Sequence, residues 1–316
     1  MTSTILRRRL SARLFACAWL ALLASSATAA GQTATHRAFA TPEDAVKALF
    51  DTVKAGNVDA LLALFGPEGR ELAASSDPAT ARMNRQVFTV AAREQWHLED
   101  ATPGQKTLVI GNEEWPFPVP LVKGADGWRF DTGAGKEELL ARRIGRNELD
   151  AIATSRAYVT AQQRYAQQGH DGKPAGAHAT KLKSDPGKEN GLYWPTVRGQ
   201  KRSPFGDLVA QAAVEGRTFG SADRPQPTGF HGYYFKILTG QGTAVSGGAK
   251  SYVVKGEMSG GFALVAWPAQ YDATGVMTFI VNQDGTVWQR DLGPDTDAIA
   301  RKMTVYNPDA SWRQVE

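Results

Sequence analysis

The sequence predicts an α+β protein with two domains: a small helix-plus-sheet domain, then a long helix packed on an antiparallel β-sheet. Three patterns support this prediction. Apolar residues recur at helical spacing in residues 42–65, a much longer helical pattern runs over residues 136–168, and from Phe230 the apolar period changes to two. A chain of 316 residues is long enough for two modest domains. We expect these domains to cover residues 41–135 and 136–316.

The N-terminus has the three parts of a secretory signal peptide. Arginines at positions 7, 8, 9 and 13 precede an apolar run at residues 14–24, and small residues at 27–29 are typical of a cleavage site. The apolar run is too short to span a bilayer comfortably. We therefore expect a signal peptide over residues 1–29, a flexible segment at 30–40 and no transmembrane segment after cleavage. The adjacent arginines also fit a twin-arginine signal, so the export route stays open.

Charge and cysteine content exclude several classes of protein. The chain has 36 Lys and Arg against 32 Asp and Glu, and the four arginines of the signal account for the whole excess. A mature chain without net charge gives no reason to expect a nucleic-acid partner. The one cysteine, Cys17, also lies in the signal, so the mature chain offers no disulfide and no cysteine nucleophile.

Helices open the first predicted domain. Thr41-Pro42-Glu43-Asp44 is a capping sequence, and Gly56 predicts the end of the helix that it starts. A second short helix begins at Asn57 or Asp59. A third helix, from about residue 77 to 95, is predicted to bury Met83, Val87 and Val90.

Strands complete this domain. Residues 108–110 are a short apolar run, and residues 115–121 (WPFPVPL) carry prolines two apart. Because such prolines remove donors along one edge, we predict an edge strand, with a polyproline-type ligand segment as the alternative. The turn residues 123–127 and the alternating residues 128–130 predict a hairpin.

The long central helix has apolar residues on two sides. One stripe contains Leu140, Ile144, Ile152 and Val159, and the other contains Ala151, Tyr158 and Tyr165. This pattern predicts a helix that is contacted from more than one direction.

The chain after this helix is irregular at 169–200 and predicts a short helix at 205–215, before strands take over. We predict strands at residues 233–238, 251–255, 261–267, 275–281 and 286–290, with turns at 240–242, 255–256 and 282–285. Asp284-Gly285 is the strongest hairpin signal in the chain. A last helix at 296–303 follows Asp295, which we expect to cap it.

Several stretches resemble one bacterial family. "NEEWPFPVPLVK", "GWRFDTGAGKEELLARRIGRNEL", "HGYYFKILTGQG" and "TGVMTFIVNQDGTVWQRDLG" are similar to the family catalogued as domain of unknown function 2950. The resemblance extends over nearly the whole mature chain. It implies an exported protein, and it brings no known activity and no established catalytic residues.

Two further resemblances concern the fold. "AVKALFDTVKAGNVDALLALF" with the later strand "GWRFD" resembles the cone fold of the nuclear-transport-factor or SnoaL type, although the predicted strands are too few for a complete cone. "RNELDAIATSRAYVTAQQRYA" resembles the globular half of a type IV pilin or pseudopilin helix. The preceding residues "GAGKEELLARRIG" are charged, where pilins carry an apolar membrane-inserting half, so we expect no insertion or polymerisation of the pilin kind.

No cofactor or metal is predicted from the motifs. His170 and His178 lie in a Gly-rich loop, where they could bind a metal opportunistically, but no two histidines have the spacing of a helical metal pair. Residues 133–136 (GAGK) suggest a phosphate loop, yet Phe130 replaces its first glycine and Glu137 stands where Ser or Thr must bind magnesium. A flexible turn that leads into the helix is the better interpretation.

The candidate interaction residues are therefore chosen by type and position. Arginines near the start of the long helix could grip an anionic partner or pair with neighbouring acids, tryptophans could pack at a junction or line a groove, and a histidine beside a tyrosine at a strand start could line a pocket. They are Arg142, Arg143, Arg146, Trp115, Trp194, His231, Tyr233 and Trp267.

We expect an exported, non-enzymatic protein of the cell envelope, periplasmic or secreted, which acts by binding another envelope protein or a small ligand. The alternative is a periplasmic hydrolase or small-ligand enzyme with a site between the two domains. The sequence contains no G-x-S-x-G nucleophile motif, which argues against an α/β-hydrolase.

Overall fold

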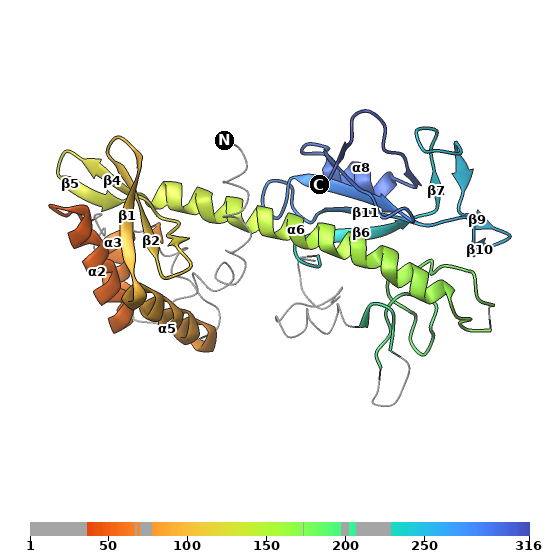
Figure 1. Ribbon diagram of the computed structural model, residues 1–316, viewed down its shortest axis with the longest axis horizontal. Coiled ribbons are helices and arrows are strands. Elements are labelled where there is room, and N and C mark those ends of the chain that lie inside the picture. The colour runs from red at the N-terminus through yellow and green to blue at the C-terminus, as the bar shows by residue number, and fades with distance from the viewer. Residues whose placement is uncertain (1–36, 67, 70–77, 173, 197–201, 207–228) are drawn as a thin grey trace. The chain divides into compact units, whose positions relative to one another are not determined.

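A computed structural model describes residues 37–316 except 67, 70–77, 173, 197–201 and 207–228 (Figure 1). The predicted signal peptide and most of the predicted helix at 205–215 lie outside the described residues. The chain divides into two compact units, Met1–Arg142 and Arg143–Glu316, and the division falls inside a long helix. In the described part of the chain, no helix is both long and apolar enough to cross a membrane.

The helices of the first unit begin and end where the sequence indicates. They are α2 (Pro42–Ala55), α3 (Val58–Phe65) and α5 (Pro78–Glu94). The hydroxyl of Thr41 accepts a hydrogen bond from the Asp44 amide at 3.1 Å, and Asn57 caps α3 through the Ala60 amide at 3.0 Å. Gly56 ends α2 in the left-handed conformation that glycine tolerates best. These capping predictions are confirmed.

The predicted buried side of α5 is wrong. Met83 and Val90 are 56% and 57% exposed and Val87 is only half-buried, whereas Phe88 and Ala91 are buried. The Phe88 ring packs on other aromatic rings, with centroid distances of 5.6 Å to Phe50 and 6.2 Å to Phe117. An aromatic ring buries more apolar area than Met or Val, so the stripe that carries Phe88 faces the core.

The sheet of the first unit is antiparallel, with strand order β1-β2-β4-β5 and with β3 also on β2. The strands are β1 (Trp96–Thr102), β2 (Gln105–Ile110), β3 (Trp115–Pro116), β4 (Leu121–Gly124) and β5 (Gly127–Phe130). The β4–β5 hairpin is confirmed, but only residues 115–116 of the predicted edge strand pair as β3. Strand β1 was not predicted, because it is almost wholly exposed and shows no apolar alternation.

The long helix α6 (Thr132–Ala166) begins earlier than the sequence suggests. Asp131 accepts a hydrogen bond from the Ala134 amide at 3.1 Å, and so caps this earlier start. Gly135 lies close to Val119, where an added Cβ would come within 2.7 Å of a Val119 methyl carbon. The flexible turn predicted at 133–136 is therefore wrong, and these glycines form the first turn of the helix.

The second unit contains a five-stranded antiparallel sheet with the order β15-β13-β12-β11-β6. Its strands are β6 (Tyr233–Leu238), β11 (Ala263–Pro268), β12 (Met277–Asn282), β13 (Val287–Asp291) and β15 (Arg313–Gln314). Four of them were predicted to within a few residues, and the Asp284-Gly285 turn joins β12 to β13 as expected. Gly285 has a φ of +80°, which suits glycine.

Smaller elements correct three local predictions. Residues 251–255 divide into β8 (Lys250–Ser251) and β9 (Val253–Val254), and β9 pairs with β10 (Glu257–Met258). The predicted turn at 240–242 instead contains β7 (Gly240–Gln241), because β14 (Val305–Tyr306) arrives from the C-terminal region to pair with it. Helix α8 (Thr296–Lys302) is confirmed, but Asp295 makes no side-chain capping bond.

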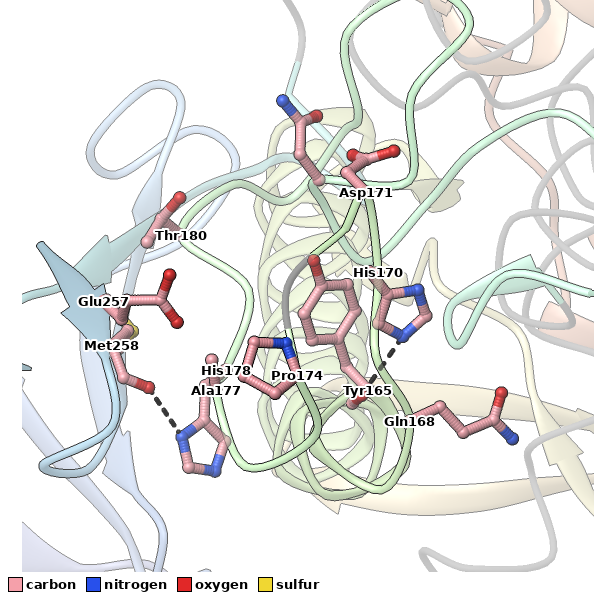
Figure 2. Close-up of a pocket in the computed structure, with 11 residues that line it drawn as sticks. Tyr165, Gln168, His170, Asp171, Pro174, Ala177, His178, Thr180, Glu257 and Met258 are labelled. Carbon is pink, nitrogen blue, oxygen red and sulfur yellow. Dashed lines mark hydrogen bonds between the residues drawn. The ribbon is translucent and has the colours of Figure 1, made fainter.

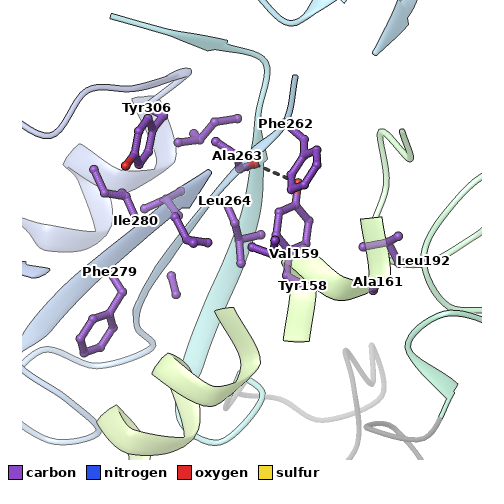
Figure 3. Close-up of a cluster of buried hydrophobic side chains, with 14 of the residues drawn as sticks. Tyr158, Val159, Ala161, Leu192, Phe262, Ala263, Leu264, Phe279, Ile280 and Tyr306 are labelled. Atoms are coloured by element: carbon purple, nitrogen blue, oxygen red, sulfur yellow. Dashed lines mark hydrogen bonds between the residues drawn. The ribbon is translucent and has the colours of Figure 1, made fainter. Parts of the chain in front are cut away.

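Helix α6 packs on this sheet through residues of both apolar stripes. In the second stripe Ala151 and Tyr158 are fully buried and Tyr165 nearly so, and in the first stripe Val159 is buried and Ile152 is half-buried. The Tyr158 ring meets Phe262 edge-on at 5.7 Å within the core of the second unit (Figure 3). The α+β fold class is confirmed, and the pilin resemblance stays a prediction.

Candidate functional site

A small pocket with both polar and apolar lining lies at the C-terminal end of α6 in the second unit. It has a cavity volume of about 50 Å³. The side chains that line it come from the last turn of α6, from the loop that follows, and from β10 (Figure 2). They include Tyr165, His170, Asp171, His178, Glu257 and Met258. Such a volume suits a small group or a few water molecules rather than a whole metabolite.

Backbone contacts hold the loop of this pocket against β10 and α6. The His178 amide donates to the Met258 carbonyl at 2.8 Å. The next residue, Ala179, is bonded twice to the Gln162 side chain of α6: its amide donates to Oε1 and its carbonyl accepts from Nε2, each at 2.8 Å. Gln162 is fully buried, so this paired bond replaces water on both of its polar atoms. The pocket loop is therefore fixed to the helix.

Both ring nitrogens of His170 are hydrogen-bonded to other parts of the protein. Its Nδ1 lies 3.0 Å from a Glu189 carboxylate oxygen, and its Nε2 lies 3.1 Å from the Tyr165 carbonyl. The ring stacks on the Tyr165 ring at 4.0 Å and its side chain is almost fully buried. His170 therefore has no nitrogen left for a ligand or a reacting group.

His178 is different, because only one of its nitrogens is bonded to a residue that the structure describes. Nδ1 donates to the Met258 carbonyl at 3.0 Å, which places the proton on Nδ1 and leaves Nε2 as an acceptor. The ring also packs on Phe262, with centroids 4.6 Å apart. Burial lowers the pKa of His178, although the Met258 bond opposes this effect. The imidazole therefore stays neutral at neutral pH and presents a lone pair on Nε2.

Acidic groups surround the hydroxyl of Tyr165. Burial, with added repulsion from Asp171, Glu189 and Glu257, raises the pKa of Tyr165 to about 12. The hydroxyl donates to the Glu189 carbonyl at 2.9 Å. At neutral pH the phenol is thus protonated and already bonded, so it cannot act as a general base.

The observed contacts give little support to the opportunistic metal site that the sequence suggested at the Gly-rich loop. The structure brings His170 and His178 to the same pocket, but His170 has both nitrogens engaged. Among the residues that the structure describes, no group of three or more His, Cys, Asp or Glu is arranged to hold a metal ion.

Two of the predicted interaction residues, Arg142 and Trp115, meet in the first unit. The Arg142 guanidinium donates to Glu138 at 2.7 Å and to the Pro116 carbonyl at 2.9 Å, and it lies over the Trp115 ring at 5.6 Å. Arg142 therefore pairs with the neighbouring acid of its own helix, the structural alternative considered from the sequence. Arg143 is exposed and Arg146 is half-buried on α6 in the second unit.

His231, Tyr233 and Trp267 gather at one end of β6 and β11. His231 has a φ of +50° and pairs through Nδ1 with Asp150 of α6 at 3.0 Å. Tyr233 is fully buried and donates to the Met277 carbonyl at 2.9 Å. Trp267 is opposite Tyr234 in the register and donates to Asp297 of α8 at 2.9 Å. The side chains of all three residues therefore make structural contacts between elements of the second unit.

The remaining candidate, Trp194, is buried near His170, with ring centroids 5.7 Å apart. It thus packs against His170, one of the residues that line the pocket. Sequence reasoning missed Tyr165 and Glu257 as pocket residues. No local pattern could have joined them, because they are 92 positions apart and meet only through the β9–β10 hairpin.

Comparisons with known proteins give a family without an activity. No curated protein matches the chain, and no solved structure matches it. The model of one family, described as "Protein of unknown function (DUF2950)", matches residues 36–315. The chain therefore belongs to the DUF2950 family of proteins of unknown function.

Proposed function

We propose that this protein is an exported, non-enzymatic binding protein of the cell envelope, and that the pocket at the end of α6 binds a small group that donates hydrogen bonds. The proposal of export, to the periplasm or beyond the cell, is supported by the signal-peptide pattern of residues 1–29. The ligand is either a small molecule or one side chain of a larger envelope partner.

One observation carries the binding proposal: His178 lines the pocket with an acceptor nitrogen, Nε2, for which the described residues provide no hydrogen-bond partner. The lone pair is held in place, because Nδ1 is anchored to Met258. The described lining also contains the carboxylates of Asp171 and Glu257 and no Lys or Arg. An acceptor-rich lining of this kind favours an ammonium, guanidinium or hydroxyl group over an anion.

The same geometry gives little support to catalysis. A general base must be able to accept a proton near the operating pH. The lowered pKa of His178 makes it a weak base, and the Tyr165 phenol stays protonated. The alternative of a periplasmic hydrolase or small-ligand enzyme stays a prediction.

Titration with methylammonium, followed by ¹H–¹⁵N spectra of the histidine rings, tests this proposal. Methylammonium is small enough for the pocket and offers N–H donors, and acetate is the matched anion that cannot donate. We expect saturable shifts of the His178 ring with methylammonium only. The variant His178→Phe keeps a ring on Phe262 but removes the acceptor, so methylammonium should no longer shift the backbone amide signals of the pocket loop, which it should shift in the parent protein. Equal shifts with both probes, or none, would contradict the proposal.

A further inference from the structure

Strand β6 forms one edge of the five-stranded sheet, and its backbone groups alternate between two sides. The Ala269 amide, on the β11 side, donates to the Gly232 carbonyl at 2.9 Å. Tyr233 faces the other way, because its amide and carbonyl both bond to Phe230 at 3.0 and 2.8 Å. Even-numbered residues of β6 therefore pair with β11, and odd-numbered residues direct their N–H and C=O groups outward.

This outer side is closed at its two ends. Tyr233 is paired with Phe230, as above. At the other end Thr239 donates to the Thr304 carbonyl at 3.0 Å and accepts from the Tyr252 amide at 2.8 Å. Between these ends lie Phe235 and Ile237. Among the described residues, no group bonds to their outward N–H or C=O. The stretch Phe235–Ile237 is therefore a gap in the pairing of this edge. Its two outward N–H groups and two outward C=O groups offer two donors and two acceptors at the spacing of a strand.

Side chains around the gap differ on the two faces of β6. Phe235 and Ile237 are half-buried and pack at the margin of the core. On the opposite face, Lys236 donates to the Arg301 carbonyl at 2.5 Å, and the Arg301 guanidinium lies over the Tyr234 ring at 5.3 Å. Burial and the nearby Arg301 charge both lower the pKa of Lys236. Arg301 is itself paired with Asp297 at 2.8 Å, and among the described residues no carboxylate pairs with Lys236, so Lys236 is the cation of this face that an acidic partner could meet.

A strand that completes this edge must match both faces. The backbone groups of the added strand that face β6 would bond to the outward groups of Phe235 and Ile237, as in other cases of strand addition to an open sheet edge. Apolar side chains would extend the surface of Phe235 and Ile237, and an acidic side chain would lie beside Lys236. A second copy of β6 matches this less well, because pairing centred on position 236 would place two lysines opposite each other.

We propose that the edge of β6 at Phe235–Ile237 binds an extended segment of another protein as an added strand, with an acidic residue beside Lys236. This interaction does not depend on the pocket at the end of α6, which lies elsewhere in the second unit. Lys236 would contribute specificity, and it also discourages self-association through the same edge.

Amide exchange in the full chain gives the first test. In the free protein, we expect the amides of Phe235 and Ile237 to exchange much faster than those of Tyr234 and Lys236. A short blocked peptide of alternating valine and glutamate should then slow exchange at Phe235 and Ile237. A matched peptide of valine and lysine should bind about fivefold more weakly, as expected for the loss of one cross-strand charge pair.

Two variants separate edge binding from general effects. Ile237→Pro removes an outward donor while leaving the even-numbered residues to pair with β11, and it should abolish protection by the peptide. Lys236→Glu should reverse the preference between the two peptides, and it retains every backbone donor if the proline variant fails to fold. Slow exchange at Phe235 and Ile237 in the free protein would overturn the proposal. So would equal effects of both peptides, or protection that appears without peptide as the protein concentration rises.

Discussion

The hydroxyl of Tyr158 in α6 donates a hydrogen bond of 3.1 Å to the carbonyl of Ala263 in β11. The same hydroxyl accepts a bond of 3.0 Å from Gln162, whose amide group also holds Ala179 in the pocket loop. All of these side chains are fully buried. One polar network therefore joins the helix, the sheet and the pocket loop. Without these hydrogen bonds, the buried hydroxyl and amide groups would lower the stability of the folded state.

Replacing Tyr158 by Phe should destabilise the second unit by about 1–3 kcal/mol, because Gln162 loses an acceptor and the Ala263 carbonyl loses a donor. Urea unfolding measured by tryptophan fluorescence checks this free energy of unfolding. Tyr271→Phe is the matched control, since its hydroxyl bonds to Asp291 at an exposed position. Equal losses for the two variants would show that the buried network has no special role.

Val159 tests the packing of α6 on the sheet. Val159 is buried whereas the next residue, Thr160, is exposed. Val159→Asp should cost several kcal/mol, because it places a carboxylate in an apolar core. Thr160→Asp should change the free energy of unfolding by less than about 0.5 kcal/mol. Thermal unfolding of both variants decides the point, and a similar midpoint for the two would mean that the helix does not pack as described.

The orientation of α5 can be tested in the first unit. Phe88→Ala should destabilise this unit by about 3–5 kcal/mol, because a buried aromatic ring leaves a cavity. Met83→Ala should have an effect below about 0.5 kcal/mol, since its side chain is more than half exposed. The reverse order of these losses in urea unfolding would restore the burial predicted from the sequence.

The raised pKa of Tyr165 predicts that the folded state loses stability in alkaline solution. Its pKa rises from 10 to about 12 on folding, mainly through burial. Above pH 10 the unfolded chain releases this proton while the folded chain retains it, so the folded state is favoured below pH 10 and its advantage is lost as pH rises through about 12. The near-ultraviolet phenolate signal of the protein minus that of Tyr165→Phe measures this titration. A midpoint near 10 would contradict it.

The sequence could predict the elements whose signals are local. Capping at Thr41 and Asn57, the Asp284-Gly285 hairpin and strand β6 all follow from residue type and spacing. It could not rank two apolar stripes on α5, because that choice depends on aromatic partners from α2 and from the segment after β3. Likewise β7 depends on β14, which lies far along the chain.

The candidate site was harder to predict for the same reason. His170 and His178 share a loop, so the sequence could single them out as a pair. Which of them keeps a ring nitrogen that no described residue bonds depends on Glu189, Tyr165 and Met258, and those contacts exist only in the folded chain. His231 and Trp267 have the residue types of binding groups, but their partners on α6 and α8 explain them as structural contacts.

The ¹⁵N chemical shift of His178 Nε2 in the full chain, with and without methylammonium, tests the proposed binding function most directly. We predict the shift of an unprotonated ring nitrogen in the free protein, and a saturable change toward the hydrogen-bonded value as methylammonium is added. A protonated Nε2 in the free protein at neutral pH, or a shift that methylammonium leaves unchanged, would contradict the account.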